Sequence, residues 1–246
     1  MASSAAAGAA ASSSPAGDAM SLMRLDAVTR TYDMGHVKVQ ALRGISMAVE
    51  EGEFVAIVGP SGSGKTTMMS ILGCLDRPST GTYQITGNDI GSLGDDALAR
   101  IRSRTIGFVF QSYNLLPGTS AIENVATPLL YQGVSRRDRS NRAGAALERL
   151  GLGERLTHEP TELSGGEQQR VAIARALVTD PAVILADEPT GNLAVQQGLE
   201  VLQLFRDLHA SGRTIVLITH NPDVAEVATR RIHLLDGRVV EEERAA

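Results

Sequence analysis

The chain has 246 residues, of which 43% are hydrophobic, so it is long enough to bury the core of one large domain or of a domain with an insertion. Its net charge is −5 with positive and negative side chains interspersed, which is not the basic stripe of nucleic-acid-binding proteins, and nucleic acid is not expected as a partner. A single cysteine, Cys74, excludes an internal disulfide framework and fits a reducing compartment.

Residues 1–20 are mostly Ala, Ser and Gly, and we expect them to form a disordered extension rather than a signal peptide or a membrane span. The remaining residues, 21–246, are expected to form one domain. It opens with two stretches rich in β-branched and apolar residues, 22–31 and 39–49, which predict strands. Tyr32 ends the first stretch, and its ring either packs in the core or stacks on a base.

A glycine-rich loop follows the apolar run 54–58, which predicts a parallel strand buried on both faces. The loop matches the phosphate-binding pattern G-x-x-x-x-G-K-[ST], and an apolar stretch suited to a helix comes after it. Strand, loop and helix together predict a nucleotide site, in which main-chain N–H groups surround the phosphates. The residues of this loop are Gly59, Pro60, Ser61, Gly62, Ser63, Gly64, Lys65, Thr66 and Thr67.

Two side chains of this loop have predicted roles of their own. Lys65 is expected to reach the outer phosphates of the nucleotide, and Thr66 to offer its hydroxyl to Mg²⁺. Lys65 is one of only two lysines in the chain, and none follows it. A GTPase is therefore not expected, because the motif that reads guanine contains a lysine.

The middle of the chain is predicted to be helical over about 112–180, as a subdomain inserted between two sets of strands. It follows the predicted strands 81–85 and 106–110. Ser120 and Glu123 form a capping box at the start of one helix, and 136–152 predicts another. Gln111 lies just after a strand, where ligands bind in open α/β sheets, but a surface glutamine is an equally good interpretation.

Residues 163–167 read Leu-Ser-Gly-Gly-Glu and lead into a predicted helix over 168–178. Ser164 and Glu167 again have the spacing of a capping box. Gly165 and Gly166 lie inside the first turn, where each glycine costs about 1 kcal/mol relative to alanine. Because a purely structural cap does not require them, we expect exposed N–H groups that bind an anion.

Charged side chains follow two further buried strands, 183–186 and 214–219. Asp187 and Glu188 are adjacent at a strand end, where carboxylates are costly to bury unless they meet a cation or transfer protons. We predict that Asp187 completes the Mg²⁺ site with Thr66, and that Glu188 orients and deprotonates the attacking water. His220 follows the second strand and is expected near the γ-phosphate.

Taken together, these motifs resemble those of the ATP-binding cassette ATPases, in the same order, over nearly all of the chain from residue 21. The resemblance implies an α/β fold: a P-loop NTPase (RecA-like) core with a mostly parallel sheet, an N-terminal antiparallel β section and an inserted helical subdomain. It also implies that Tyr32 stacks on adenine, that Gln111 is the lid glutamine that touches Mg²⁺ and the transporter, and that His220 is the switch histidine.

In this family two cassettes face head to tail. The resemblance therefore implies that Ser164, Gly165 and Gly166 contact the γ-phosphate of ATP held by the partner's loop, in a homodimer or with a related cassette. ATP hydrolysis then drives a separate transmembrane permease, which places the cassette on the cytoplasmic face of the cell membrane. The stretch 110–131 is similar to the branch that serves lipoprotein release, macrolide-type export and cell-division permeases.

One position departs from the family pattern. Ala194 stands where an aspartate nearly always helps to link the two active sites, so we expect reduced or uncoupled hydrolysis with intact ATP affinity. The alternative function is a regulatory cassette that binds ATP with weak or no hydrolysis. The retained Glu188 and His220 favour the hydrolysing interpretation.

Overall fold

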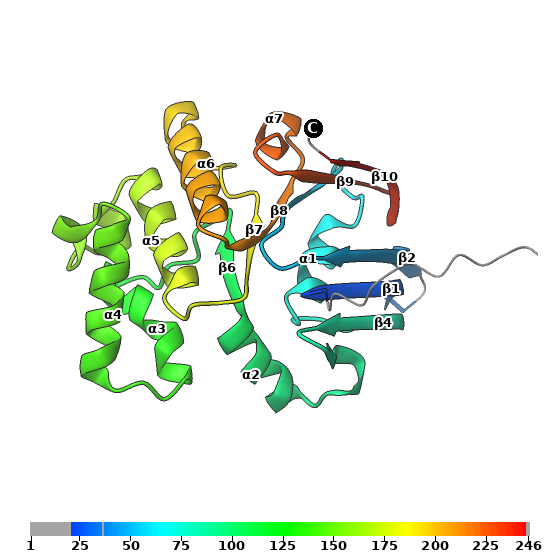
Figure 1. Ribbon diagram of the computed structural model, residues 1–246, viewed down its shortest axis with the longest axis horizontal. Helices are drawn as coiled ribbons and strands as arrows, with labels where there is room; N and C mark the ends of the chain where they lie inside the picture. The colour runs from blue at the N-terminus through cyan, green and yellow to red at the C-terminus, as the bar shows by residue number, and fades with distance from the viewer. Residues whose placement is uncertain (1–20, 36, 245–246) are drawn as a thin grey trace, which may run out of the picture.

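The computed structural model describes residues 21–35 and 37–244. Two sheets and a group of helices make up the structure (Figure 1). It confirms the α/β fold, with a mostly parallel sheet and an antiparallel section near the N-terminus. The extension expected over 1–20 lies outside the described residues.

The larger sheet contains six strands, of which five are parallel and one edge strand is antiparallel. Every residue of its strands β3 and β8 is buried, because helices or the second sheet cover both faces. In spatial order the strands are β10 (Arg238–Arg244), β9 (Arg230–Leu235), β3 (Phe54–Val58), β8 (Thr214–Thr219), β7 (Val183–Asp187) and β6 (Ile106–Phe110).

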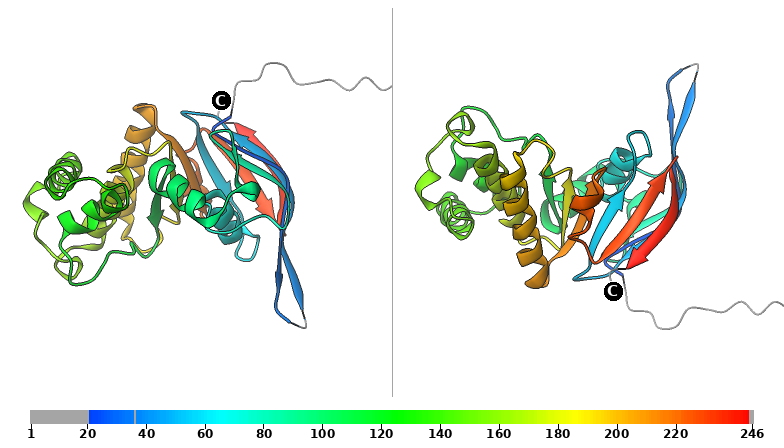
Figure 2. Two further views of the ribbon diagram at one scale, coloured as in Figure 1. Left: turned by 90° about the horizontal axis from the view of Figure 1, so that it is seen from below. Right: turned by 90° about the horizontal axis from the view of Figure 1, so that it is seen from above.

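The smaller sheet contains four antiparallel strands, and its long hairpin of β1 and β2 projects beyond the rest of the structure (Figure 2). One face of this sheet packs on the core, so buried and exposed residues alternate through part of each strand. In spatial order the strands are β2 (Lys38–Val49), β1 (Met23–Asp33), β4 (Thr80–Ile85) and β5 (Asn88–Asp89).

Seven helices and three short 3₁₀ turns connect these strands in the described part of the chain. Three helices gather at one end of the structure, opposite the smaller sheet, and we call them the helical block (Figure 1). The block consists of α3 (Ala121–Tyr131), α4 (Arg136–Arg149) and α5 (Gly165–Leu177). The others are α1 (Lys65–Leu72), α2 (Asp95–Thr105), α6 (Val195–Ala210), α7 (Pro222–Ala225), η1 (Ile90–Ser92), η2 (Gly153–Arg155) and η3 (Pro160–Glu162).

Three apolar clusters hold these layers together. The first lies between the two sheets and includes the buried side of α1, the second covers the opposite face of the larger sheet under α6, and the third is the interior of the helical block. Helix α5 belongs to two of them: Ile173 and Ala176 pack on the sheet, whereas Val171 and Ala174 pack inside the block. The block is thus joined to the sheet body chiefly through α5.

Several elements differ from the sequence predictions. The stretch 112–180 is not wholly helical, because 3₁₀ turns and loops separate its three helices, and the helix predicted over 136–152 ends at Arg149. Helices α2 and α6 and the β9–β10 hairpin were not predicted. Leu98 is the only buried residue of α2, so its sequence shows little apolar periodicity.

Candidate active site

The glycine-rich loop connects β3 to α1 and has no room for side chains at its base. A Cβ atom on Gly59 would lie 2.2 Å from the main-chain oxygen of Leu234, and Gly64 has a φ of +103°, in the left-handed region that favours glycine. Helix α1 has no side-chain cap and no acidic residue in its first turn. No side chain of the helix therefore competes with an anion for its first N–H groups, which fits the predicted phosphate site.

Lys65 folds back over this loop. Its Nζ donates hydrogen bonds to the main-chain oxygens of Gly59 at 2.6 Å and Pro60 at 2.8 Å. The hydroxyl of Ser63 is buried and has no hydrogen-bond partner among the described residues. A buried polar atom without a partner is costly, so the loop fits a polar ligand such as a phosphate chain.

An open cleft leads to the loop, and the carboxyl ends of three parallel strands meet there. Gln111 follows β6, Asp187 and Glu188 stand at the end of β7, and His220 follows β8. Because these strands are neighbours in one parallel sheet, residues far apart in sequence come together at one edge. Of the predicted site residues, the cleft is lined by Ser61, Gly62, Gly64, Lys65, Thr66, Thr67, Gln111, Asp187, Glu188 and His220.

Glu188 is held by three groups from the end of β8. One carboxylate oxygen accepts from the hydroxyl of Thr219 at 2.8 Å, and the other lies 2.7 Å from the main-chain N of His220 and 2.5 Å from its Nδ1. The backbone of Glu188 is itself in the left-handed region, with φ +43°. Such a conformation persists only where the surroundings fix it, and it is common at functional sites.

Asp187, Thr66 and Gln111 offer the cleft a carboxylate, a hydroxyl and an amide oxygen, which are the hard donors that Mg²⁺ prefers. Burial raises the pKa of Asp187, and the neighbouring Glu188 raises it further, while Lys65 opposes the shift. A bound cation would stabilise this crowded carboxylate, so the donor set fits the metal. The side chain of Gln111 is at present bonded to Asn192, with Nε2 to Oδ1 at 3.0 Å.

Tyr32 does not line this cleft. Its hydroxyl donates to Asp76 at 2.9 Å, and the guanidinium of Arg30 covers one face of the ring at 4.6 Å from the centroid. Cleft-lining residues that the sequence analysis missed come instead from β2 and from the turn after β9. They carry no motif and could be found only from the strand pairing: Val39, Gln40, Ala41, Arg43, Asp236 and Gly237.

Ser164, Gly165 and Gly166 also lie outside the cleft, at the start of α5. The hydroxyl of Ser164 accepts from the N–H of Glu167 at 3.3 Å, and Glu167 accepts from the N–H of Ser164 at 2.8 Å, which is the predicted capping box. These bonds, together with Arg155, lower the pKa of Glu167 to about 2. The two glycines keep this turn free of side chains beside Tyr113 and Gln197.

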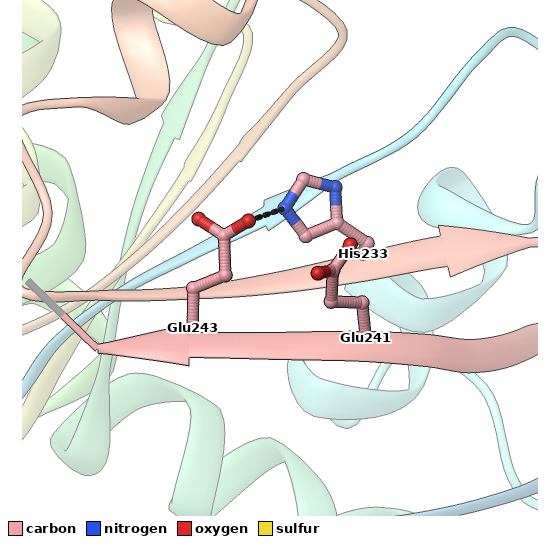
Figure 3. A group of neighbouring side chains, drawn as sticks. All are labelled: His233, Glu241 and Glu243. Carbon is pink, nitrogen blue, oxygen red and sulfur yellow. Dashed lines mark ion pairs between the residues drawn. The ribbon is translucent and has the colours of Figure 1, made fainter.

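A second group of potential metal ligands lies on the β9–β10 hairpin, and its three residues do not line the cleft; Figure 3 shows their side chains. His233, Glu241 and Glu243 bring ligand atoms within 4.8 Å of one another. However, Arg231 already forms an ion pair with Glu243 at 2.9 Å, and His233 Nε2 lies 3.6 Å from the other oxygen of that carboxylate. Glu243 is therefore already engaged by ion-pair contacts that join the two strands, and the group is not taken as a metal site.

Comparison with known proteins agrees with this geometry. The family model described as "ABC transporter" matches residues 42–191. An ABC transporter ATP-binding protein of Thermotoga maritima is 56% identical over 89% of this chain and 93% of its own length. The macrolide export ATP-binding/permease protein MacB of Rhodospirillum rubrum is 57% identical over 90% of this chain, which spans only 34% of MacB.

A solved structure is similar along nearly its whole length. The dimeric post-hydrolysis state of the ATP-binding cassette MJ0796, bound to ADP and Pi, has a TM-score of 0.83 and 45% identity, covering 90% of this chain and 98% of that one. In the described residues of the present chain, no helix is long and apolar enough to cross a membrane.

Proposed function

The chain belongs to the ABC transporter family as an ATP-binding, ATP-hydrolysing cassette, and from this premise we propose that ATP-dependent closure of a dimer of such cassettes drives a separate membrane permease. The observation that supports this proposal most strongly is that Ser164–Gly166, at the start of α5, does not line the cleft that contains Lys65 and Glu188. Within one chain the γ-phosphate is exposed to solvent on one side. A second copy facing head to tail supplies the missing turn, so ATP becomes part of the dimer interface.

In the proposed closed dimer each residue of the cleft has a separate role in binding or hydrolysing ATP. Lys65 and the N–H groups of the loop hold the phosphates, and Tyr32, which does not line the cleft of the single chain, is proposed to stack on adenine. Thr66, Asp187 and Gln111 would hold Mg²⁺, and a bound Mg²⁺ would neutralise the charge that develops on the phosphates. Glu188 orients the attacking water and accepts its proton, while His220 fixes the carboxylate of Glu188 and faces the γ-phosphate.

The surface proposed for the permease is a second cleft, between α2, β6 and the helical block. It combines exposed apolar side chains, among them Leu75 and Tyr131, with arginines 100, 102 and 175. An apolar and basic cleft suits an amphipathic helix that carries acidic residues. Gln111 lines the nucleotide cleft and directly follows Phe110, which lines the second cleft, and this adjacency supports the proposal that the two sites are coupled.

We further propose that the transporter exports its substrate. This proposal rests on the similarity to MacB, whose ATP-binding portion the present chain matches. The substrate itself is proposed to be bound by the permease. Through the permease the cassette is proposed to lie at the cytoplasmic face of the membrane.

The experiment that tests this function compares the natural chain with Glu188→Gln. Both are assayed for ATP hydrolysis and run on size exclusion with ATP and Mg²⁺. Losing a general base costs about 10²–10⁴-fold in rate, so the variant is expected to keep ATP and to accumulate as a dimer. Lys65→Ala is the control that removes phosphate binding and with it the dimer. A Glu188→Gln chain that binds ATP but stays monomeric would contradict the proposal.

The regulatory alternative depends on Ala194. This residue is the N-cap of α6, has no side-chain capping bond and is exposed. If the natural chain binds ATP and dimerises but does not turn over, the regulatory cassette is the better description. Turnover that Glu188→Gln abolishes rules it out.

A further inference from the structure

The loop that follows Gln111 has an unusual backbone. Tyr113 and Asn114 are consecutive non-glycine residues in the left-handed region, with φ of +58° and +50°. Each such residue costs of order 1 kcal/mol or more, so the surrounding structure must fix them. We call residues 111–120, between β6 and α3, the lid segment.

Arg175 of α5 fixes this part of the lid segment. Its guanidinium donates one hydrogen bond to the main-chain oxygen of Asn114 at 2.5 Å and another to that of Tyr113 at 2.7 Å. The planar fork of an arginine suits two neighbouring acceptors, and lysine cannot reproduce it. The side chain is largely desolvated, which lowers the pKa of Arg175 and strengthens both bonds.

The other end of the lid segment is fixed to the helical block as well. Asn124 of α3 is fully buried; its Oδ1 accepts from the N–H of Leu116 at 2.7 Å, and its Nδ2 donates to the oxygen of Thr119 at 2.9 Å. By contrast, the first residue of the segment, Gln111, is bonded across the cleft to Asn192. The segment therefore starts in the nucleotide site and ends bound to the block.

Arg175 also connects this segment to the turn proposed to contact the partner's ATP. It lies on the same helix as Gly165, and the ring hydroxyl of Tyr113 lies 3.0 Å from where a Cβ on Gly165 would be. Helix α5 thus begins at the Ser164–Gly166 turn and, near its other end, binds the lid segment through Arg175. The two cannot move independently while both arginine bonds persist.

We propose that Arg175 is a positioning residue that makes the lid segment and the Ser164–Gly166 turn move as one unit when ATP binds. The proposal rests on the proposed function, because it assigns a role in the same catalytic cycle. Arg175 is not among the residues that line the cleft around Lys65. Its loss is therefore expected to lower turnover and dimer formation without weakening the binding of ATP to a single chain.

The experiment uses a fluorescent reporter in the lid segment. The chain contains no tryptophan, and Leu116 is 47% exposed, so Leu116→Trp gives one signal from this segment alone. In this reporter chain we compare Arg175→Lys with Arg170→Lys. Arg170 lies on the same helix, but it forms an exposed ion pair with Glu200 at 3.3 Å and does not contact the lid segment.

With Arg175→Lys we expect the ATP-dependent change in tryptophan fluorescence to disappear and kcat to fall about tenfold, the equivalent of two lost hydrogen bonds, with the Kd for ATP unchanged. Arg170→Lys is expected to leave the ATP-dependent fluorescence change, kcat and the Kd for ATP unchanged. If Arg175→Lys behaves like Arg170→Lys, the proposal is overturned. If the reporter chain itself neither hydrolyses ATP nor dimerises, the proposed function fails, whatever Arg175 does.

A second variant covers the case in which Arg175→Lys does not fold, as judged by circular dichroism. Asn114→Gly retains the main-chain acceptor but removes the restraint on the backbone, since glycine adopts many more conformations. We expect a folded chain with a smaller loss of the ATP-dependent fluorescence change, in the same direction. An unaltered signal and unaltered turnover in this variant would overturn the proposal.

Discussion

The sheet body contains the cleft around Lys65, the helical block contains the Ser164–Gly166 turn that is proposed to complete the site, and the two regions are built differently. In the sheet body Asp187 and Glu188 stand at the end of the buried strand β7, and Lys65 begins α1 after the loop that follows the buried strand β3, so the fold itself fixes their positions. In the block the Ser164–Gly166 turn is fixed by the capping box at the start of α5 and by the ion pair of Glu167 with Arg155, and α5 joins the block to the body. The helical block has an apolar core of its own, so it can move relative to the sheet body when, as proposed, it completes the site of a partner cassette.

The largest effect that separates the two regions is expected from core truncation. Leu147, in the block, and Leu217, in β8, are both fully buried, and replacing either by alanine costs about 2–5 kcal/mol of unfolding free energy. Urea unfolding measures this loss, and a fluorescent nucleotide measures binding. Only Leu217→Ala is expected to weaken nucleotide binding. Equal weakening by Leu147→Ala would show that the block and the body do not act as separate units.

The next effect concerns Tyr32, which is proposed to stack on adenine. If Tyr32 stacks on adenine, Tyr32→Ala loses about 1–3 kcal/mol of binding free energy, as base–aromatic stacking does elsewhere. Tyr32→Phe keeps the ring but removes the hydrogen bond to Asp76, so its ATP affinity is expected to stay close to that of the natural chain. Isothermal titration with ATP distinguishes the two variants. An equal loss in both would assign Tyr32 to packing against Asp76 instead.

A smaller effect is expected where the two regions meet at the start of α6. Alanine is a poor N-cap, and Ala194→Asp is expected to raise the unfolding free energy by about 1 kcal/mol, because aspartate caps the free N–H groups. The same change is expected to increase turnover or its cooperativity. Ala182→Asp, at an exposed position that begins no helix, is the control for added charge. Unchanged turnover and unchanged cooperativity would contradict the role inferred for this position.

The smallest effect tests the cap that fixes the Ser164–Gly166 turn. The folded-state pKa of Glu167 is lowered from 4.5 to about 2, so its charged form stabilises the fold above pH 4.5 and that contribution is lost as the pH falls towards 2. Because the carboxylate is partly exposed, the contribution is expected to stay below about 1 kcal/mol. The difference in unfolding free energy between the natural chain and Glu167→Gln should vanish near pH 2. If the difference in unfolding free energy between the natural chain and Glu167→Gln did not depend on pH, the stabilising role of the Glu167 charge would be contradicted.

The sequence allowed the buried strands and the phosphate loop to be predicted because each has an unmistakable local pattern. Continuous apolar runs predicted β3, β7 and β8, and the charged residues after them were correctly expected to meet at one sheet edge. The capping box at Ser164 was equally visible. Local patterns were therefore sufficient wherever burial or a cap determined the structure.

The remaining features depend on contacts between distant segments. The β9–β10 hairpin was missed because ion pairs such as Arg230–Glu242 stabilise it, and its polar residues resemble those of a loop. The hydrogen bonds from Arg175 to the lid segment are accepted by main-chain oxygens. Every residue has a main-chain oxygen, so the sequence gives no sign of these contacts. Only the assembled fold reveals such contacts.

The most direct test of a site shared between two chains is complementation. Lys65→Ala removes the phosphate contact and Gly165→Asp places a negative charge in the turn proposed to meet the γ-phosphate, so each variant alone is expected to be inactive. Mixed head to tail, they form heterodimers with one intact site, and ATP hydrolysis is expected to return to about a quarter of the natural value. If each chain instead contains its whole site, the mixture stays as inactive as its components.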